Sequence, residues 1–115
     1  MARNDEMFSS VARSSQDQAG VFEYDRDVGY FYLYETGANN DKKIVAAIRI
    51  LVGEPDFNEE DVAIRWNSSE NIVGLFIRNQ LWAAFNLQTG AKHGGNYCTD
   101  NQPMIPVEIS DVFKS

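Results

Sequence analysis

The chain has very few of the residues that most often carry chemistry or cross-links. Among its 115 residues there is one cysteine, Cys98, and one histidine, His93. A single cysteine excludes an intramolecular disulfide framework and agrees with a reducing compartment. Any Ser–His or Cys–His mechanism would have to use His93, because there is no second histidine. We therefore expect no disulfide scaffold and few ways to build an enzyme.

Basic residues are also scarce. The chain carries 17 acidic and 10 basic residues, which gives a net charge of -7, and it has no basic stripe. This balance repels a phosphate backbone and disfavours nucleic-acid binding. No apolar run approaches the length of a membrane span, and the N-terminal residues do not resemble a signal peptide. These features predict an acidic cytoplasmic protein that binds neither nucleic acid nor membranes.

Strand-forming residues are concentrated in one stretch, residues 62–87, which also holds both tryptophans. Two polar turn segments, residues 67–70 and 79–80, interrupt it, so it predicts three consecutive antiparallel strands. If residues 79–80 form a two-residue loop, Ile77 faces Trp82 across the ladder. A four-residue loop after Trp66 places Ile64 opposite Val73.

Both faces of this three-stranded sheet are apolar, whereas an antiparallel sheet with one wet face normally alternates apolar and polar residues. The second face therefore needs a cover: the rest of the chain, a second sheet or another subunit. We expect a second copy to supply it, in a homo-oligomer that is most simply a dimer. The expected core face carries Val62, Ile64, Trp66, Val73, Leu75, Ile77, Trp82 and Ala84. The residues expected to join the copies are Ile72, Phe76, Leu81 and Phe85.

The rest of the chain also reads as mainly β, α+β at most. Residues 1–19 are polar and predict a flexible or short helical N-terminal arm, ahead of a single β-rich domain over residues 20–115. Residues 21–24 and 28–35 are expected strands, and residues 36–41 an expected loop. Residues 43–52 suit a buried helix or a buried strand, and their β-branched side chains favour the strand. The expected fold is an antiparallel β-meander of about six strands.

Three tyrosines at alternate positions, Tyr30, Tyr32 and Tyr34, would share one face of the strand at residues 28–35. Together with Trp66 or Trp82 they are candidates to line an amphipathic pocket or to anchor an interface. The alternative is that they are ordinary strand residues with hydroxyl groups at the wet margin of the sheet. Both interpretations stay open at this point, with the second slightly favoured.

Candidate catalytic groups are weak. His93, Cys98 and Asp100 lie close in sequence but lack a recognised ligand spacing. Glu23 and Asp25 would lie on one side of a strand, roughly 7 Å apart, as in a glycosidase pair or simply as edge-strand charges. The second account is the more probable for this pair. We predict no catalytic residue, no metal site and no cofactor.

Several short motifs resemble those of a small bacterial domain-of-unknown-function family. They are the GYFY strand at residues 29–32, the "I-x-W-S"-like strand and turn at residues 62–68, the hairpin at residues 77–85, and a "GYC"-like segment at residues 96–98. This chain departs from the family pattern at Asn67 and at Asn96. The resemblance covers residues 20–98 and implies a compact β-rich fold without bringing an activity. Small acidic proteins of this kind are often carried on mobile gene cassettes.

These observations favour a non-catalytic domain that works by contact with a protein partner or by self-assembly. The alternative is a small-ligand-binding domain with an aromatic-lined pocket. Tyr30, Tyr32, Tyr34, Trp66 and Trp82 are the candidate contact residues in either case.

Overall fold

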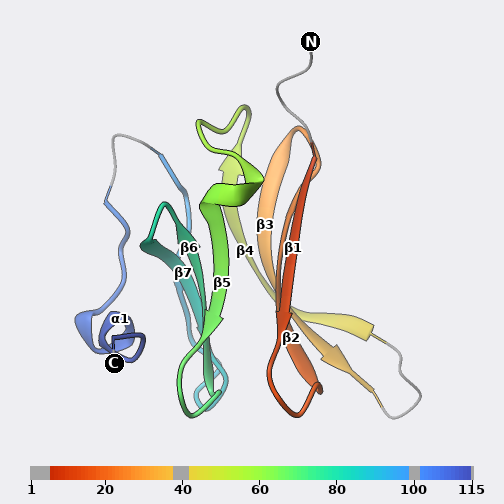
Figure 1. Ribbon diagram of the computed structural model, residues 1–115, viewed down its shortest axis with the longest axis vertical. Helices are drawn as coiled ribbons and strands as arrows, with labels where there is room; N and C mark the ends of the chain where they lie inside the picture. The colour runs from red at the N-terminus through yellow and green to blue at the C-terminus, as the bar shows by residue number, and fades with distance from the viewer. Residues whose placement is uncertain (1–5, 38–41, 99–101, 115) are drawn as a thin grey trace.

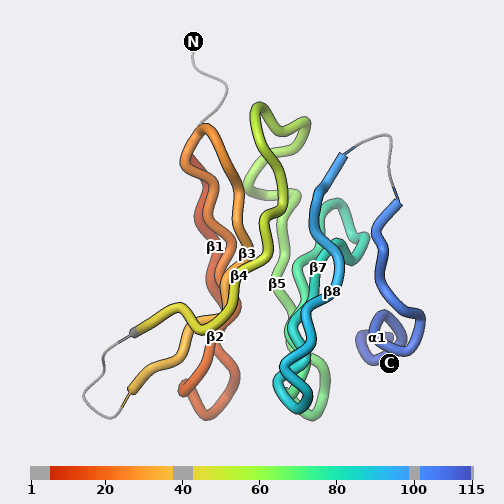
Figure 2. The backbone as a smooth tube through the Cα atoms, turned by 180° about the vertical axis from the view of Figure 1, so that it is seen from behind, coloured from red at the N-terminus to blue at the C-terminus, as the bar shows by residue number. Residues whose placement is uncertain are grey.

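Two four-stranded antiparallel sheets pack face to face in the computed structural model, which describes residues 6–37, 42–98 and 102–114 (Figures 1 and 2). Strands that follow one another in sequence lie side by side in each sheet, so each sheet is a meander. Sheet A has the order β1-β2-β3-β4 and sheet B the order β5-β6-β7-β8. The elements are β1 (Met7–Ala12), β2 (Gln18–Tyr24), β3 (Val28–Thr36), β4 (Lys42–Val52), η1 (Glu59–Asp61), β5 (Val62–Trp66), β6 (Ile72–Ile77), β7 (Gln80–Asn86), β8 (Lys92–Gly94) and α1 (Val107–Asp111).

The mainly β prediction is confirmed, with 52% strand and 8% helix, but there are eight strands where about six were expected. The ambiguous segment at residues 43–52 is a strand, β4. The expected N-terminal arm is wrong for the described residues, because β1 pairs along its whole length with β2 and the expected boundary at residue 20 falls inside β2. The polar sequence between these strands is their turn, with Gln16 at a φ of 63°. Most of the loop expected at residues 36–41 lies outside the described residues.

The predicted register of sheet B is wrong at the β6–β7 hairpin. The turn residues are Arg78 and Asn79, both at positive φ (52° and 68°), and Gln80 already pairs with Ile77. Two consecutive positive φ values are typical of the tight turns that match strand twist. Asn tolerates this conformation well, but nothing in an arginine signals it. The β5–β6 turn is also displaced, because the amide of Asn67 donates to the carbonyl oxygen of Ile72, and Ile64 lies opposite Leu75, not Val73.

An irregularity between Leu75 and Phe76 adds one residue to β7, since Leu75 pairs with Ala83 while Phe76 pairs with Leu81. A bulge of this kind reverses the faces of all later residues in the strand. Phe85 therefore points into the core between the sheets, and Ala84, expected on the core face, packs on the outer face.

Aromatic and branched residues from both sheets fill the core. Phe31 of β3 stacks on Phe85 of β7 with ring centroids 5.0 Å apart, and both side chains are fully buried. Tyr24, also buried, donates its hydroxyl hydrogen to the carbonyl oxygen of Gly53 at 2.9 Å. This bond satisfies the one polar atom that the ring carries into the core.

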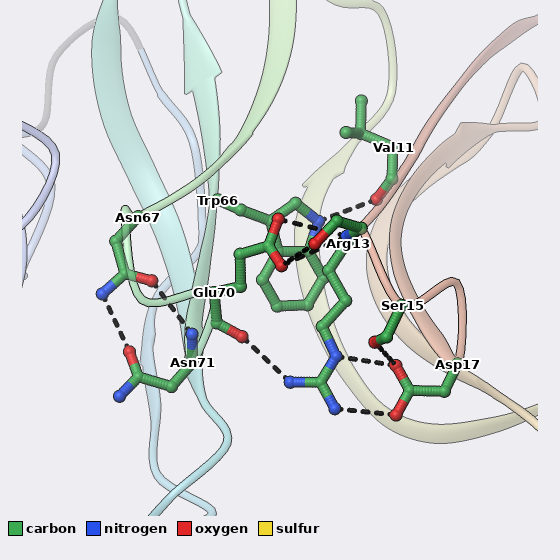
Figure 3. Close-up of polar contacts among 9 residues, drawn as sticks. Val11, Arg13, Ser15, Asp17, Trp66, Asn67, Glu70 and Asn71 are labelled. Atoms are coloured by element: carbon green, nitrogen blue, oxygen red, sulfur yellow. Dashed lines mark hydrogen bonds and ion pairs between the residues drawn. The ribbon is translucent and has the colours of Figure 1, made fainter.

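Polar contacts close the sandwich on the side of β1 and β5 (Figure 3). The indole nitrogen of Trp66 donates to the carbonyl oxygen of Val11 at 2.9 Å. Arg13 donates to the carbonyl oxygen of Glu70 at 2.9 Å and to both carboxylate oxygens of Asp17 at 2.7 and 2.8 Å. The bonds from Arg13 hold the pKa of the Asp17 carboxyl well below its usual range. The two sheets are thus tied together at this edge.

The opposite side is closed by the segment after β8. The amide of Asn96 donates to the carbonyl oxygen of Arg49 at 3.1 Å, and that of Tyr97 to Ile50 at 2.5 Å. The Tyr97 ring lies 4.6 Å from the Trp82 ring, and its hydroxyl donates to Asp56 at 2.7 Å. Part of the edge of β4 is therefore covered by a segment that continues from sheet B.

The chain's own C-terminal segment, residues 102–114, covers the outer face of sheet B. Phe113 meets the ring of Phe76 edge-on at 5.3 Å, and it lies over Gly74, where an added Cβ would come within 2.9 Å of it. Phe76 and Leu81 are each only 8% exposed. The apolar contacts join Ile105, Ile109, Val112 and Phe113 to Ile72, Phe76, Leu81 and Ala84.

This cover removes the reason for expecting a second copy on the outer face of sheet B. Of the residues expected to join copies, Ile72, Phe76 and Leu81 lie beneath the C-terminal segment, while Phe85 lies in the core. Docking of the segment depends on these contacts, because a five-residue helix is too short to be stable alone.

We expect Phe113→Ala to lower the free energy of unfolding by about 3 kcal/mol, because it removes the largest side chain that the segment buries. Urea denaturation followed by tryptophan fluorescence measures the change. Val107→Ala is the matched control, since Val107 lies on the same helix with 66% of its surface exposed. An equal effect of the two substitutions would contradict the assigned role of Phe113.

Burial first, and then the hydrogen bond to Asp56, raises the pKa of Tyr97 from its usual 10.0 to about 12. Neutral Tyr97 therefore stabilises the fold fully below pH 10, and we expect this contribution to be lost as the pH rises from 10 to 12. Absorbance titration of tyrosinate checks the assignment. Tyr97→Phe should remove a late-titrating group from the curve.

Candidate functional site

The outer face of sheet A carries no covering element among the described residues (Figures 1 and 2). Side chains alternate between the two faces of a strand. Phe22, Phe31 and the residues at alternate positions point into the core, so the residues between them point outward. We call this surface the tyrosine face. It consists of Phe8, Ser10, Ala12, Ala19, Val21, Glu23, Tyr30, Tyr32, Tyr34, Ile44, Ala47 and Arg49.

The three tyrosines form a continuous aromatic stripe along β3. Tyr30 and Tyr32 stack with ring centroids 5.5 Å apart, and Tyr34 meets Tyr32 edge-on at 6.0 Å. All three side chains are half-buried by their neighbours. Burial, followed by the nearby Glu23 carboxylate, raises the pKa of Tyr32. Tyr32 therefore stays neutral at ordinary pH, and the three rings present flat, amphipathic surfaces.

The residues of the tyrosine face form three rows that run across the four strands, because each residue pairs with a partner on the next strand. Glu23 and Arg49 flank Tyr30, whereas Val21 and Ala47 flank Tyr32. The charged side chains are thus confined to one row and the other two rows are neutral. In order from β1 to β4 the rows are Phe8–Glu23–Tyr30–Arg49, Ser10–Val21–Tyr32–Ala47 and Ala12–Ala19–Tyr34–Ile44.

A shallow hollow of about 380 Å³ lies on this face beside β1. Its walls include the rings of Phe8 and Tyr34, and its polar groups come from Ser10, Gln16 and Gln18. No charged side chain lines it, and Phe8 is 58% exposed. Such a surface suits a neutral, partly apolar partner.

The two tryptophans do not join the tyrosines. Trp66 lies at the edge between the sheets, where Arg13 covers its ring at 5.9 Å (Figure 3). Trp82 is buried in the core against Tyr97. The five aromatic residues predicted from the sequence therefore occupy three separate places and do not line one pocket.

The remaining candidate groups are also scattered. His93 lies on β8 opposite Ala84, and Cys98 is exposed beyond the end of that strand. The third member of the predicted trio, Asp100, lies outside the described residues. Over residues 6–37, 42–98 and 102–114, no group of three or more His, Cys, Asp or Glu residues could hold a metal ion.

Glu23 and Asp25, the paired acids of the sequence analysis, differ in their hydrogen bonding. Asp25 accepts hydrogen bonds from the amides of Asp27 and Val28 at 3.0 and 2.9 Å, which lowers its pKa and closes the β2–β3 turn. Glu23 instead points out from β2 on the tyrosine face. Both residues nevertheless line one hollow, together with Glu6 and Glu59, and Asp25 also holds the turn.

Sequence reasoning missed the contribution of β1 to this face. Phe8 and Ser10 were assigned to a flexible or helical arm, yet they form one side of the hollow. The available signal was local: residues 13–17 contain two serines, a glutamine and an aspartate, which is a turn composition between two short alternating segments.

In the part of the chain that the structure describes, no helix is both long and apolar enough to cross a membrane. A family model described as "Uncharacterized protein conserved in bacteria (DUF2251)" matches residues 2–112. No curated protein and no solved structure matches the chain. The match supports the resemblance to a bacterial family of unknown function, and the individual motifs and the mobile-cassette origin stay predictions. Because the family model spans almost the whole length of the sequence, the chain belongs to the DUF2251 family of bacterial proteins.

Proposed function

We propose that this protein is a non-catalytic interaction module that self-associates through the tyrosine face. The observation that carries the proposal is an uncovered sheet face with an aromatic stripe at its centre. The other outer face, on sheet B, is occupied by the chain's own residues 102–114. Self-association through the tyrosine face would bury Phe8, which is otherwise largely exposed.

The composition of the face is typical of protein recognition surfaces. Tyrosine offers a large contact area with few rotatable bonds, and serine adds adaptable hydrogen bonding. Aromatic side chains are enriched in the cores of interfaces, where a few of them supply most of the binding free energy. Tyr32, at the centre of the three rows, is the expected anchor.

The rows are self-complementary under a two-fold axis that runs parallel to the strands between β2 and β3. This axis places β1 of one copy over β4 of the other, and β2 over β3. Glu23 then faces Tyr30 of the second copy, and Phe8 faces Arg49, a cation–π arrangement. The small residue Ala19 faces Tyr34. Like charges do not meet, and in the two neutral rows large side chains face smaller ones, as an isologous interface requires.

The net charge of -7 on each copy opposes association. At physiological ionic strength this repulsion is screened beyond roughly 8 Å, so it acts mainly at low salt. Dimerisation through a largely neutral face should therefore strengthen as the salt concentration rises.

The alternative of an aromatic-lined pocket receives less support from these residues. Trp66 and Trp82 lie elsewhere, and of the five candidate aromatic residues only Tyr34 lines the hollow beside β1. A stripe of rings along a strand fits a broad protein contact better than an aromatic-lined pocket.

Sedimentation over a range of protein concentrations tests the proposal. We expect a homodimer with a Kd in the micromolar range, about -8 kcal/mol. Phe8→Ala and Tyr32→Ala should each weaken the dimer at least about tenfold, as truncation of an interface anchor does. A wild-type protein that stays monomeric at millimolar concentration would refute self-association.

Val107→Ala is the matched control, because it truncates a comparably exposed apolar residue on α1, over sheet B. It should leave the dimer unchanged. A thermal melt of each variant, at a protein concentration below the Kd, separates a loss of association from a loss of folding. Phe8→Ala should have the same melting temperature as the wild type. Equal weakening by Phe8→Ala and Val107→Ala would place the interface elsewhere.

A further inference from the structure

A second cavity, of about 470 Å³, lies between sheet B and the C-terminal segment that covers it. Its apolar wall is formed by Phe76 and Leu81 of the sheet and by Ile105 and Phe113 of the segment. Arg65 and Lys114 also line it. The volume falls within the range of small-molecule pockets, which combine apolar walls with a few polar groups.

The charge of this cavity is opposite to that of the chain as a whole. Among the described residues, no aspartate or glutamate lines it, although acidic residues outnumber basic ones by 17 to 10. Lys114 pairs with the exposed Asp111 at 3.4 Å, so these two charges largely offset each other. Arg65 forms no ion pair with a carboxylate in the described part of the chain. The local excess is therefore one positive charge, carried by Arg65.

Neighbouring groups hold the Arg65 guanidinium in place. It lies over the Phe76 ring, 5.0 Å from the centroid, and one of its terminal nitrogens donates to the carbonyl oxygen of Phe113 at 3.2 Å. This is the one hydrogen bond that the side chain makes to the described residues, and a guanidinium has five N–H donors. A planar, orientated guanidinium is the group best matched to a carboxylate, which it binds through two parallel hydrogen bonds.

We infer that this cavity is a binding site for an amphipathic monocarboxylate. The carboxylate binds Arg65, and an aromatic or aliphatic body lies against Phe76, Leu81 and Ile105. One excess positive charge selects a monoanion over a phosphate dianion, and the apolar wall selects against small inorganic anions. Side-chain amides of Asn79 and Gln80 at the β6–β7 turn add hydrogen-bonding groups to the rim.

Such a ligand would also hold the C-terminal segment on the sheet. Phe113 contributes both its ring to the cavity wall and its carbonyl oxygen to the Arg65 contact. A molecule that contacts the segment and the sheet together binds the closed arrangement in preference to the displaced one. Binding therefore raises the melting temperature.

Titration of the full chain with phenylbutyrate, against the neutral phenylbutyramide of similar shape, tests the inference. Calorimetry gives the affinity, and two-dimensional amide NMR locates the site. We expect phenylbutyrate to bind at least about tenfold more tightly than the amide, as a charge-assisted bidentate pair requires. Amide shifts should concentrate at residues 79–81 and 109–114. Equal binding of acid and amide, no binding at millimolar ligand, or shifts centred elsewhere would overturn it.

Substitutions locate the charge. Arg65→Gln should weaken phenylbutyrate binding at least about tenfold. Arg65→Lys keeps the positive charge but loses the planar guanidinium, so its affinity should lie between those of the wild type and Arg65→Gln. Arg26→Gln makes the same charge change at the exposed β2–β3 turn, outside both surfaces, and should leave binding unchanged. Inorganic phosphate should not displace the ligand, and effective displacement by it would overturn the assignment to a carboxylate. The acid–amide comparison uses only the wild-type chain, so it decides the question even if an Arg65 variant folds poorly.

Discussion

The burial of both faces of sheet B is the constraint on which the rest of the structure depends. Its inner face packs on sheet A through contacts such as Phe31 against Phe85, and its outer face packs under Phe113. A sheet that is apolar on both sides has no stable arrangement with one side in water. One meander and one C-terminal segment therefore cover it, and no element in the described part of the chain covers the outer face of sheet A. The candidate interaction surface follows from this arrangement.

Features that depend on local chemistry could be read from the sequence. The three strands after residue 61, the tyrosine alternation and the strand at residues 43–52 all follow from β-branched and aromatic patterns. The apolar second face of sheet B was also visible. The rest of the chain was one of the possible covers, but the choice between it and a second copy was not visible, because residues 107–113 offer only four apolar side chains and no capping signal. Their partner surface is distant in sequence, and pattern reasoning does not identify long-range partners.

Other features depend on backbone conformation that residue type hardly encodes. Arg78 adopts a positive φ that its side chain does not favour, and the turn moves by one residue as a result. The bulge near Leu75 then exchanges the faces of Ala84 and Phe85. A one-residue error in register thus changed the predicted oligomer face, because side-chain direction alternates along a strand.

Two surfaces with different chemistry result, and they lie on opposite layers of the sandwich. The tyrosine face is broad and mostly neutral, and its rows match a second copy of themselves. The cavity beneath the C-terminal segment is small and has one orientated arginine in an apolar wall. Phe113 belongs to the second surface alone, and Phe8 to the first alone, so the two can be separated by substitution. If both are occupied in one molecule, the ligand stabilises the layer opposite the dimer contact, and any coupling between them must pass through the shared core around Phe31 and Phe85.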